Sequence, residues 1–293
     1  MAVFAGVSHT NPMALLIQLS ANEWNLLEEK CKNALQSLDL ISKPQLGKKI
    51  SAEQITETNL SRSAKNNTLT PQQIAPYIDH TLLKADATPE QIIQLCKEAD
   101  EYGFATVCVN SVYLSIAAEI LKNSKTKPIA VVGFPLGATL TTAKCFEAKA
   151  AITQGAQEID MVLPIGLLKS GNWKSVYIDI ASVVEASKPF PVKVILETCL
   201  LTDAEKVVAC VLSREAGAAF VKTSTGFSTA GATTEDIALM RFIVGSEMGV
   251  KASGGIRTTQ DALNMITSGA DRIGASASIQ IVQNKSGHTK NGY

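Results

Sequence analysis

The sequence predicts an α/β protein: a closed (β/α)8 TIM barrel with an N-terminal helical extension. From residue 77 onward, short apolar runs rich in β-branched residues alternate with amphipathic stretches. The runs are apolar throughout, which is typical of parallel strands that are covered on both faces. Eight such units within residues 73–283 suit a compact barrel. The predicted strands are residues 78–83, 105–110, 129–134, 158–164, 192–198, 220–225, 250–255 and 272–275.

The predicted helices lie between these runs, at residues 88–102, 141–154, 203–215, 233–247 and 258–268. Thr88, Thr202 and Thr233 stand where N-caps are expected, and glycines such as Gly103 follow several helices. The alternative is a doubly wound open sheet. It fits less well, because no GxGxxG motif follows the first strand.

Residues 1–72 differ from the rest because they contain no strand-like run. Ser20 and Glu23 have the spacing of a capping box. The apolar stripe that follows predicts a helix and consists of Trp24, Leu27, Cys31, Leu35 and Leu38. A second helix is expected at residues 51–61, followed by a polar linker at 61–70. We therefore predict an extension and linker (1–72), a barrel (73–283) and a flexible tail (284–293), with the stripe packed on the barrel exterior or on a second copy.

The composition narrows the range of partners. Lys plus Arg equals Asp plus Glu, 27 of each, so no global field favours nucleic acid or an anionic membrane. No stretch approaches the ~20 apolar residues of a membrane helix, and we recognise no signal peptide. The six cysteines are scattered without a CxxC pair, which is typical of free thiols in a reducing compartment. We expect a cytoplasmic homo-oligomer, a dimer or a tetramer.

Three charged residues stand in the middle of predicted strands, where a barrel is normally apolar. They are Asp160, Lys222 and Lys251, on the fourth, sixth and seventh strands. A lysine attacks carbonyl groups only when it is neutral, and both desolvation and a neighbouring cation lower its pKa. Lys222 beside Lys251 predicts a Schiff-base nucleophile, with Asp160 as a proton carrier. A C–C bond β to the resulting iminium can then break.

The other interpretation is a buried salt-bridge network without chemistry. Two like charges on neighbouring strands argue against it, because burying them is costly. Lys193, Glu158 and Glu197 are further strand charges. Glu158 and Lys193 stand early in their strands, so we expect a structural pair near the bottom of the barrel.

Glycine-rich segments follow the last strands and predict a phosphate site. Gly254 and Gly255 follow the seventh strand, while Gly274 and Ser276 mark the eighth and open a short last helix. These loops and an extra helix form the recurrent phosphate site of such barrels. Gly226, after the sixth strand, is expected to join them. Alternatively, the glycines simply end strands.

Metal chemistry is not expected. The chain has only three histidines, His9, His80 and His288, and no HxH or HExxH spacing. A zinc-dependent mechanism is therefore disfavoured. We predict neither a metal nor an organic cofactor.

Five segments resemble the deoxyribose-phosphate aldolases. They are YIDHTLL at 77–83, VVGFPLG at 131–137, EIDMV at 158–162, FVKTSTGF at 220–227 and VKASGGIR at 250–257. The resemblance spans about residues 74–283. It implies reversible cleavage of 2-deoxy-D-ribose 5-phosphate to acetaldehyde and glyceraldehyde 3-phosphate. It further implies that Lys222 forms the Schiff base, that Lys251 perturbs it and relays protons, and that Asp160 is the proton donor and acceptor.

The same resemblance places Asp79 and Thr81 near the substrate hydroxyl groups, and Thr225 in the substrate site beside Gly226. Some members have a lysine where Phe227 stands, so one phosphate contact is expected to be missing here. Some also end in tyrosine, and we expect Tyr293 to assist the proton step at the enamine carbon.

Cys108 ends the second predicted strand on the catalytic rim. It is either an auxiliary thiol that reacts with unsaturated aldehydes or a small buried core residue. Two rival functions remain for the whole chain: another Schiff-base or phosphate-binding barrel enzyme, such as a transaldolase-like one, and a non-catalytic sugar-phosphate binder. The presence of Lys222, Lys251 and Asp160 together argues against the binder.

Overall fold

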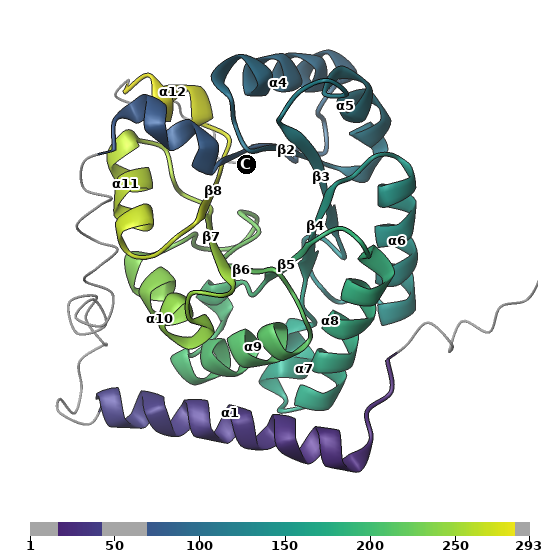
Figure 1. Cartoon of the computed structure of the whole chain (residues 1–293), viewed down its shortest axis with the longest axis vertical. Coiled ribbons are helices and arrows are strands. Elements are labelled where there is room, and N and C mark those ends of the chain that lie inside the picture. Colours follow the sequence, from purple (N-terminus) through teal and green to yellow (C-terminus); the bar gives the residue numbers. More distant parts are fainter. Residues whose placement is uncertain (1–16, 43–68, 285–293) are drawn as a thin grey trace, which may run out of the picture.

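The computed structural model describes residues 17–42 and 69–284. Its strands pair in parallel in chain order, and β1 pairs with β8, so the sheet closes into a barrel (Figure 1). The closed sheet confirms the barrel and excludes the open sheet. The strands are β1 (Ile78–Leu82), β2 (Thr106–Val109), β3 (Lys127–Val132), β4 (Glu158–Val162), β5 (Val192–Ile195), β6 (Phe220–Lys222), β7 (Gly249–Ser253) and β8 (Arg272–Ala275).

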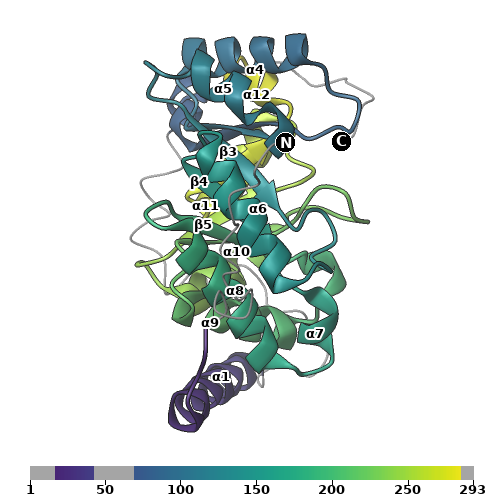
Figure 2. The same ribbon diagram turned by 90° about the vertical axis from the view of Figure 1, so that its right-hand side faces the viewer.

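Helices surround the strands (Figures 1 and 2). They are α4 (Pro89–Tyr102), α5 (Leu114–Ile120), α6 (Thr141–Thr153), α7 (Ile165–Lys169), α8 (Trp173–Ser187), α9 (Asp203–Glu215), α10 (Thr234–Val244), α11 (Thr259–Thr267) and α12 (Ser278–Val282). The described residues also include three short 3-10 segments: η2 (Pro71–Tyr77), η3 (Ser111–Tyr113) and η4 (Thr198–Leu200). Within the described ranges, no helix is both long and apolar enough to cross a bilayer.

The helix ends follow the expected capping chemistry. Thr88 and Thr202 are N-caps with complete capping boxes, closed by Gln91 and Glu205. Such boxes satisfy backbone N–H groups that have no partner within the helix. Gly103 ends α4 with φ 70°, a left-handed conformation that a residue without Cβ adopts at little cost.

The side chains of the strands divide into two environments. The outward ones, such as Ile159 and Val194, are fully buried against the helices in the main core. The inward ones alternate with them, because successive residues of a strand point to opposite faces. Asp160 is therefore directed into the lumen between two outward apolar neighbours, and it pairs in register with Lys193 on β5.

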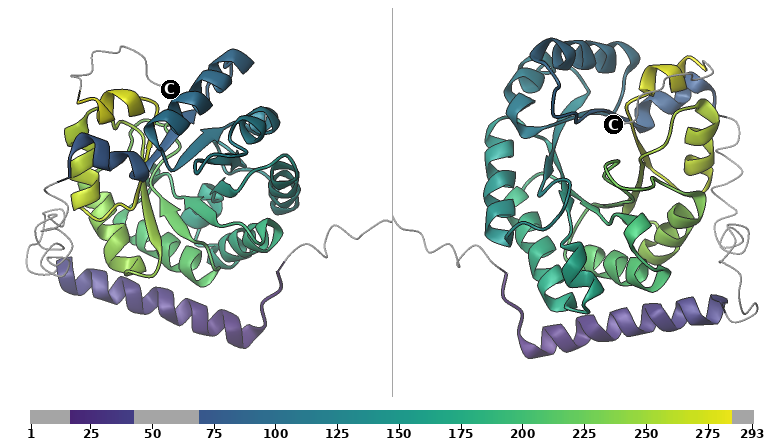
Figure 3. Two further views of the ribbon diagram at one scale, coloured as in Figure 1. Left: turned by 45° about the horizontal axis from the view of Figure 1, so that its top comes forward. Right: turned by 180° about the vertical axis from the view of Figure 1, so that it is seen from behind.

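The N-terminal extension contributes one helix to the described structure, α1 (Ala21–Ser42). The predicted capping box is present, because Glu23 N donates to Ser20 Oγ and Ser20 N donates to Glu23 Oε2. The helix lies across α9 on the outside of the barrel (Figures 1 and 3), where Leu27 and Cys31 are buried. Trp24 and Leu35 also pack against the core, so these four residues of the stripe lie on the barrel exterior, while the side chain of Leu38 is outside the described residues. The helix expected at 51–61 and Tyr293 fall outside the described residues.

Candidate active site

The three predicted catalytic residues meet in the lumen. Asp160 Oδ2 lies 3.0 Å from Lys222 Nζ and 2.7 Å from Lys251 Nζ. The two lysines are opposite each other in register on β6 and β7. Strand alternation and barrel closure therefore bring together residues that are more than 60 positions apart in sequence.

The network extends further than the sequence indicated. Lys193 contacts Glu158, as predicted for a structural pair, but its Nζ also lies 2.9 Å from Asp160 Oδ1. Both oxygens of Asp160 thus accept from ammonium groups. On the other side, Lys251 Nζ lies 2.5 Å from Asp79 Oδ2, and Asp79 Oδ1 contacts Arg272. Asp79 is therefore an ion-pair partner of the lumen network, a role that its sequence position alone did not reveal.

The lumen network has more basic side chains than carboxylates. Four basic side chains, Lys193, Lys222, Lys251 and Arg272, meet three carboxylates, Glu158, Asp160 and Asp79. Lys222 touches a single carboxylate, whereas Lys193 and Lys251 each touch two. A neutral Lys222 balances the cluster, because an excess charge in a dry interior is costly.

The pKa values shift in the directions that this balance requires. Burial lowers the pKa of Lys222, and the Lys251 cation lowers it further against the opposing effect of Asp160. Burial also acts to lower the pKa of Lys251, but the carboxylates of Asp160 and Asp79 outweigh it and hold that pKa above its usual value. Lys222 is therefore the amine that loses its proton more easily.

Asp160 remains ionised. Burial alone would raise the pKa of this carboxyl, but Lys193, Lys222 and Lys251 together hold it well below its usual value. The Lys222 side chain retains 3% exposure, whereas those of Lys251 and Asp160 have none. Lys222 is thus the most exposed member of this trio.

Apolar side chains form the remaining wall of the lumen. Leu83, Cys108, Ile129 and Val131 pack together, with Phe134 against them. Cys108 is fully buried, and burial raises the pKa of its thiol. Reactive cysteines are exposed and have a lowered pKa, so this environment favours the core interpretation over the reactive one.

The glycine loops show two different reasons for glycine. Gly254 and Gly255 have φ of 85° and 79°, which L side chains rarely adopt. Gly274 lies within β8, where an added Cβ would stand 2.2 Å from Ser253 Oγ and 3.1 Å from Lys251 Cε. Gly274 therefore leaves room first for Ser253 and then for Lys251, a role that its place beside the phosphate motif did not suggest. Ser276 is exposed directly after β8.

Glu197 is a site residue that sequence reasoning left among the alternatives. It adopts φ 58°, uncommon for a residue with a side chain, and is buried at 3% exposure. Its carboxylate accepts from the N–H and hydroxyl of Thr225 and so fixes the loop after β6. The available signal in the sequence was an acidic residue near the end of the apolar strand predicted at 192–198. Its backbone conformation depends on tertiary contacts.

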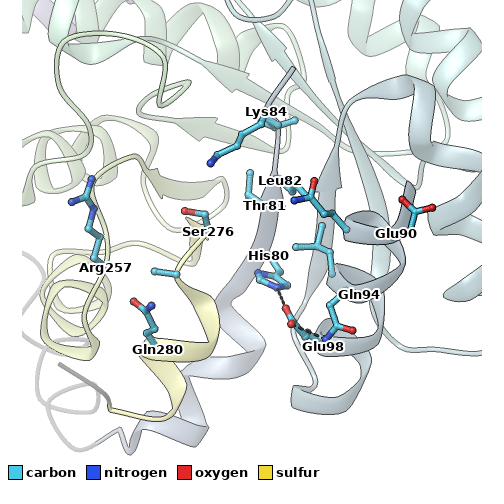
Figure 4. A pocket seen from close by; sticks show the side chains of 14 residues that line it. His80, Thr81, Leu82, Lys84, Glu90, Gln94, Glu98, Arg257, Ser276 and Gln280 are labelled. Atoms are coloured by element: carbon cyan, nitrogen blue, oxygen red, sulfur yellow. Dashed lines mark hydrogen bonds and ion pairs between the residues drawn. The ribbon is translucent and has the colours of Figure 1, made fainter. Parts of the chain in front are cut away.

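A cavity of about 560 Å³ adjoins the rim of the barrel beside β1 (Figure 4). Thr81, Leu83 and Ser276 line it, and it continues outward along α4. Lys222, Lys251 and Asp160 do not line it, but Leu83 does, and Leu83 packs with the apolar side chains Cys108, Ile129 and Val131. His80 also lines it and links two helices, with Nδ1 2.9 Å from Ser278 Oγ and Nε2 3.0 Å from Glu98 Oε2.

The part of the chain that the structure describes holds no group of three or more His, Cys, Asp or Glu side chains placed to share a metal ion.

A closed barrel with a buried lysine of lowered pKa beside a carboxylate is suited to an enzyme that acts on carbonyl compounds. Comparison with known proteins makes this class specific. Residues 74–287 match the DeoC/LacD family aldolases, and the chain belongs to this family. It is an aldolase, a carbon–carbon lyase.

Individual relatives and solved structures that resemble the chain point to the same family. The chain is 60% identical over 207 residues to the deoxyribose-phosphate aldolase of Streptococcus gordonii, covering 71% of this chain and 94% of the relative. It is 58% identical over 211 residues to that of Clostridium botulinum strain Langeland, covering 72% and 100%. A putative deoxyribose-phosphate aldolase from Coccidioides immitis superposes with a TM-score of 0.71 at 44% identity, covering 78% of this chain and 96% of the other. The tetrameric deoxyribose phosphate aldolase of Aeropyrum pernix gives a TM-score of 0.71 at 35% identity, covering 80% and 97%.

Proposed function

We propose that this aldolase reversibly cleaves 2-deoxy-D-ribose 5-phosphate to acetaldehyde and D-glyceraldehyde 3-phosphate through a Schiff base on Lys222. The observation that carries the proposal is the placement of Lys222 against Asp160 beside the charged Lys251. This environment lowers the pKa of Lys222, while its neighbours Asp160 and Lys251 stay ionised. The names of the relatives support the substrate.

In the proposed reaction, the neutral Lys222 amine attacks C1 of the open-chain sugar to form a carbinolamine. Lys251 donates a proton to the C1 hydroxyl group, which leaves as water and gives the iminium. Asp160 accepts the proton that the nitrogen loses and returns it to Lys251, to which it is bonded.

Bond cleavage uses the iminium as an electron sink. A base takes the proton of the C3 hydroxyl, the C2–C3 bond breaks, and its electron pair forms the enamine at C1–C2. Glyceraldehyde 3-phosphate leaves with the new C3 aldehyde. The enamine carbon C2 then takes up a proton, and water hydrolyses the iminium to acetaldehyde and free Lys222. We assign these transfers to Asp160 and Lys251, and we propose that Tyr293 assists protonation at C2.

The phosphate is proposed to bind at the rim, against the backbone of Gly226, Gly254 and Gly255 and the hydroxyl of Ser276. Positive φ at the three glycines turns the loops tightly there. Thr81 in β1 and Thr225 after β6 both lie toward the C-terminal ends of their strands, and we propose that they contact the sugar. Neither a metal nor an organic cofactor enters this mechanism.

Borohydride trapping tests the proposal. Reduction in the presence of acetaldehyde should add one ethyl group to Lys222, read by peptide mass spectrometry, and a coupled assay should show cleavage of the phosphorylated sugar. An unmodified Lys222 would favour the non-catalytic binder. Trapping at Lys222 without cleavage of this sugar would favour a different Schiff-base enzyme, such as a transaldolase-like one.

We further propose a cytoplasmic homo-oligomer, a dimer or a tetramer. The six free cysteines fit a reducing compartment, and one structural relative is a tetramer. Residues 1–72 are proposed as an extension separable from catalysis, and residues 284–293 as a tail beyond the barrel.

A further inference from the structure

The proposed phosphate site needs a cation, and the loop after β6 provides no charge at Phe227. The Phe227 ring packs edge-on against Phe134 at 5.2 Å between centroids. A sugar phosphate carries nearly two negative charges at neutral pH, and basic side chains near such groups form charge-assisted hydrogen bonds. The basic residue must therefore come from another part of the rim.

Lys84 is a basic side chain at this rim. It is half-buried two residues after the end of β1, and it lines the rim cavity together with Ser276 and Arg257. In Figure 4, its ammonium group is directed toward the side of the cavity where Ser276 and Arg257 lie. Lys84 thus shares one cavity with Ser276 of the proposed phosphate site and with Arg257, which follows the glycines of the loop after β7.

The Lys84 ammonium group has no carboxylate partner among residues 17–42 and 69–284, unlike the buried lysines of the barrel. Lys144 pairs with Asp179 and Lys206 with Asp236. The two carboxylates that line the same cavity do not neutralise Lys84. Glu98 is bonded to His80 and Gln94, and Glu90 is exposed in the first turn of α4. A half-buried ammonium without an acidic partner is suited to an anionic ligand.

The backbone around Lys84 is anchored on both sides. Asn110 Nδ2 donates to Leu83 O at 3.3 Å, and the Tyr113 hydroxyl donates to Ala87 O. Between these anchors, Ala87 N donates to Lys84 O in a turn. The base of the side chain is therefore held in place before a ligand arrives, which lowers the entropy cost of binding.

We propose that Lys84 binds the phosphate group of the substrate from the β1 side, opposite the glycine loops after β6 and β7. This inference rests on the proposed function, since it names a further residue for the same substrate. It makes Lys84 a binding residue that selects phosphorylated sugars and takes no part in the chemistry at Lys222.

The test compares Lys84→Met and Lys84→Arg with Lys97→Met, a control that removes an exposed lysine of α4. Lys84→Met should raise KM for 2-deoxyribose 5-phosphate by about 10- to 100-fold, as expected for one lost charged hydrogen bond. Its kcat and its kcat/KM for unphosphorylated 2-deoxyribose should stay near wild type, because that sugar never uses the contact. Lys84→Arg should restore most of the affinity, and Lys97→Met should behave as wild type.

Binding of inorganic phosphate, measured by calorimetry on the same proteins, separates the two proposals. If the wild type does not cleave the phosphorylated sugar, the proposed function fails, while weaker phosphate binding by Lys84→Met still supports the anion site. Unchanged phosphate affinity in Lys84→Met, or equal losses on both sugars, would overturn the role of Lys84. Thermal unfolding of each variant shows whether a loss comes from misfolding.

Discussion

The barrel buries ion pairs in two places, the lumen and the shell between strands and helices, and they are built differently. In the shell, Lys144 Nζ lies 2.8 Å from Asp179 Oδ2 and 2.9 Å from Val162 O, while Thr141 donates to the other Asp179 oxygen. Each charge there is matched and satisfied. In the lumen, the basic groups outnumber the carboxylates by one. Lys222 contacts a single carboxylate there, that of Asp160. The shell pair is balanced in charge, whereas the surplus of basic groups in the lumen supports the proposed role of Lys222 as the nucleophile.

The largest expected effect follows from replacing one lysine in each region. Lys222→Met should lower turnover by at least about 10⁴-fold, because the nucleophile is lost, and should leave the folded state as stable or more stable. Lys144→Met should instead cost about 3–5 kcal/mol of unfolding free energy, since it leaves Asp179 buried without its partner. Denaturant titration and single-turnover assays on both variants measure the contrast. Substantial activity in Lys222→Met would move the nucleophile elsewhere.

The second prediction concerns the pH dependence of the amine. Lys251→Leu removes a positive charge that lowers the pKa of Lys222. That pKa should rise, so less neutral amine is present near pH 7, and the remaining activity should shift to higher pH. Turnover should fall by about 10²-fold or more, since a proton carrier is also lost. A pH–rate profile with the wild-type midpoint would remove Lys251 from the control of Lys222.

The network also predicts the acid stability of the protein. Burial opposes ionisation of Asp160, but Lys193 and its other cationic partners hold its pKa below the unfolded value of about 3.9. This depressed pKa contributes stability at higher pH, and the contribution is lost as the pH falls through the folded pKa. Lys193→Met should therefore move acid unfolding, followed by circular dichroism, to higher pH. The exposed Lys188→Met serves as the matched control, and an equal shift in both variants would contradict the argument.

A smaller and selective effect is expected at the rim. Ser276→Glu and Gly255→Asp each place a carboxylate where the phosphate is proposed to bind. Like-charge repulsion should raise KM for the phosphorylated sugar by about 10- to 100-fold, while unphosphorylated deoxyribose is affected much less. Steady-state kinetics on both sugars measures this difference. Equal losses of activity on the two sugars would show that the phosphate binds elsewhere.

The smallest effect on catalysis is expected from removing the extension. A chain that starts at Thr70 retains every strand of the barrel and should keep its kcat. It exposes the surface of α9 that Leu27 and Cys31 cover, which should cost about 2–4 kcal/mol of stability. Calorimetry and light scattering report the stability and any change in oligomer size. A truncated chain that is folded but inactive would show that the extension takes part in catalysis.

Much of the fold followed from local patterns in the sequence. All eight expected strands are present, because continuous apolar runs between helices are buried on both faces only in a covered parallel sheet. The Ser20–Glu23 capping box starts α1, because a cap depends on side chains three residues apart. The charges of Asp160, Lys222 and Lys251 within apolar runs marked them as candidates, because charged side chains in a barrel strand need a special environment. The closed sheet then showed that all three point into the lumen.

Long-range contacts decided what the sequence left open. The partners of Asp79 and Lys193 depend on the register between neighbouring strands and across the lumen, which a single strand pattern does not encode. The need for glycine at 274 comes from the Ser253 and Lys251 side chains on β7, with Ser253 the closer of the two. The carboxylate of Glu197 is bonded to Thr225 in the loop after β6. Residue types and their periodicity therefore determined the barrel and the candidate amine Lys222. The charge balance that sets the pKa of that amine arises only when the closed sheet brings the strands together.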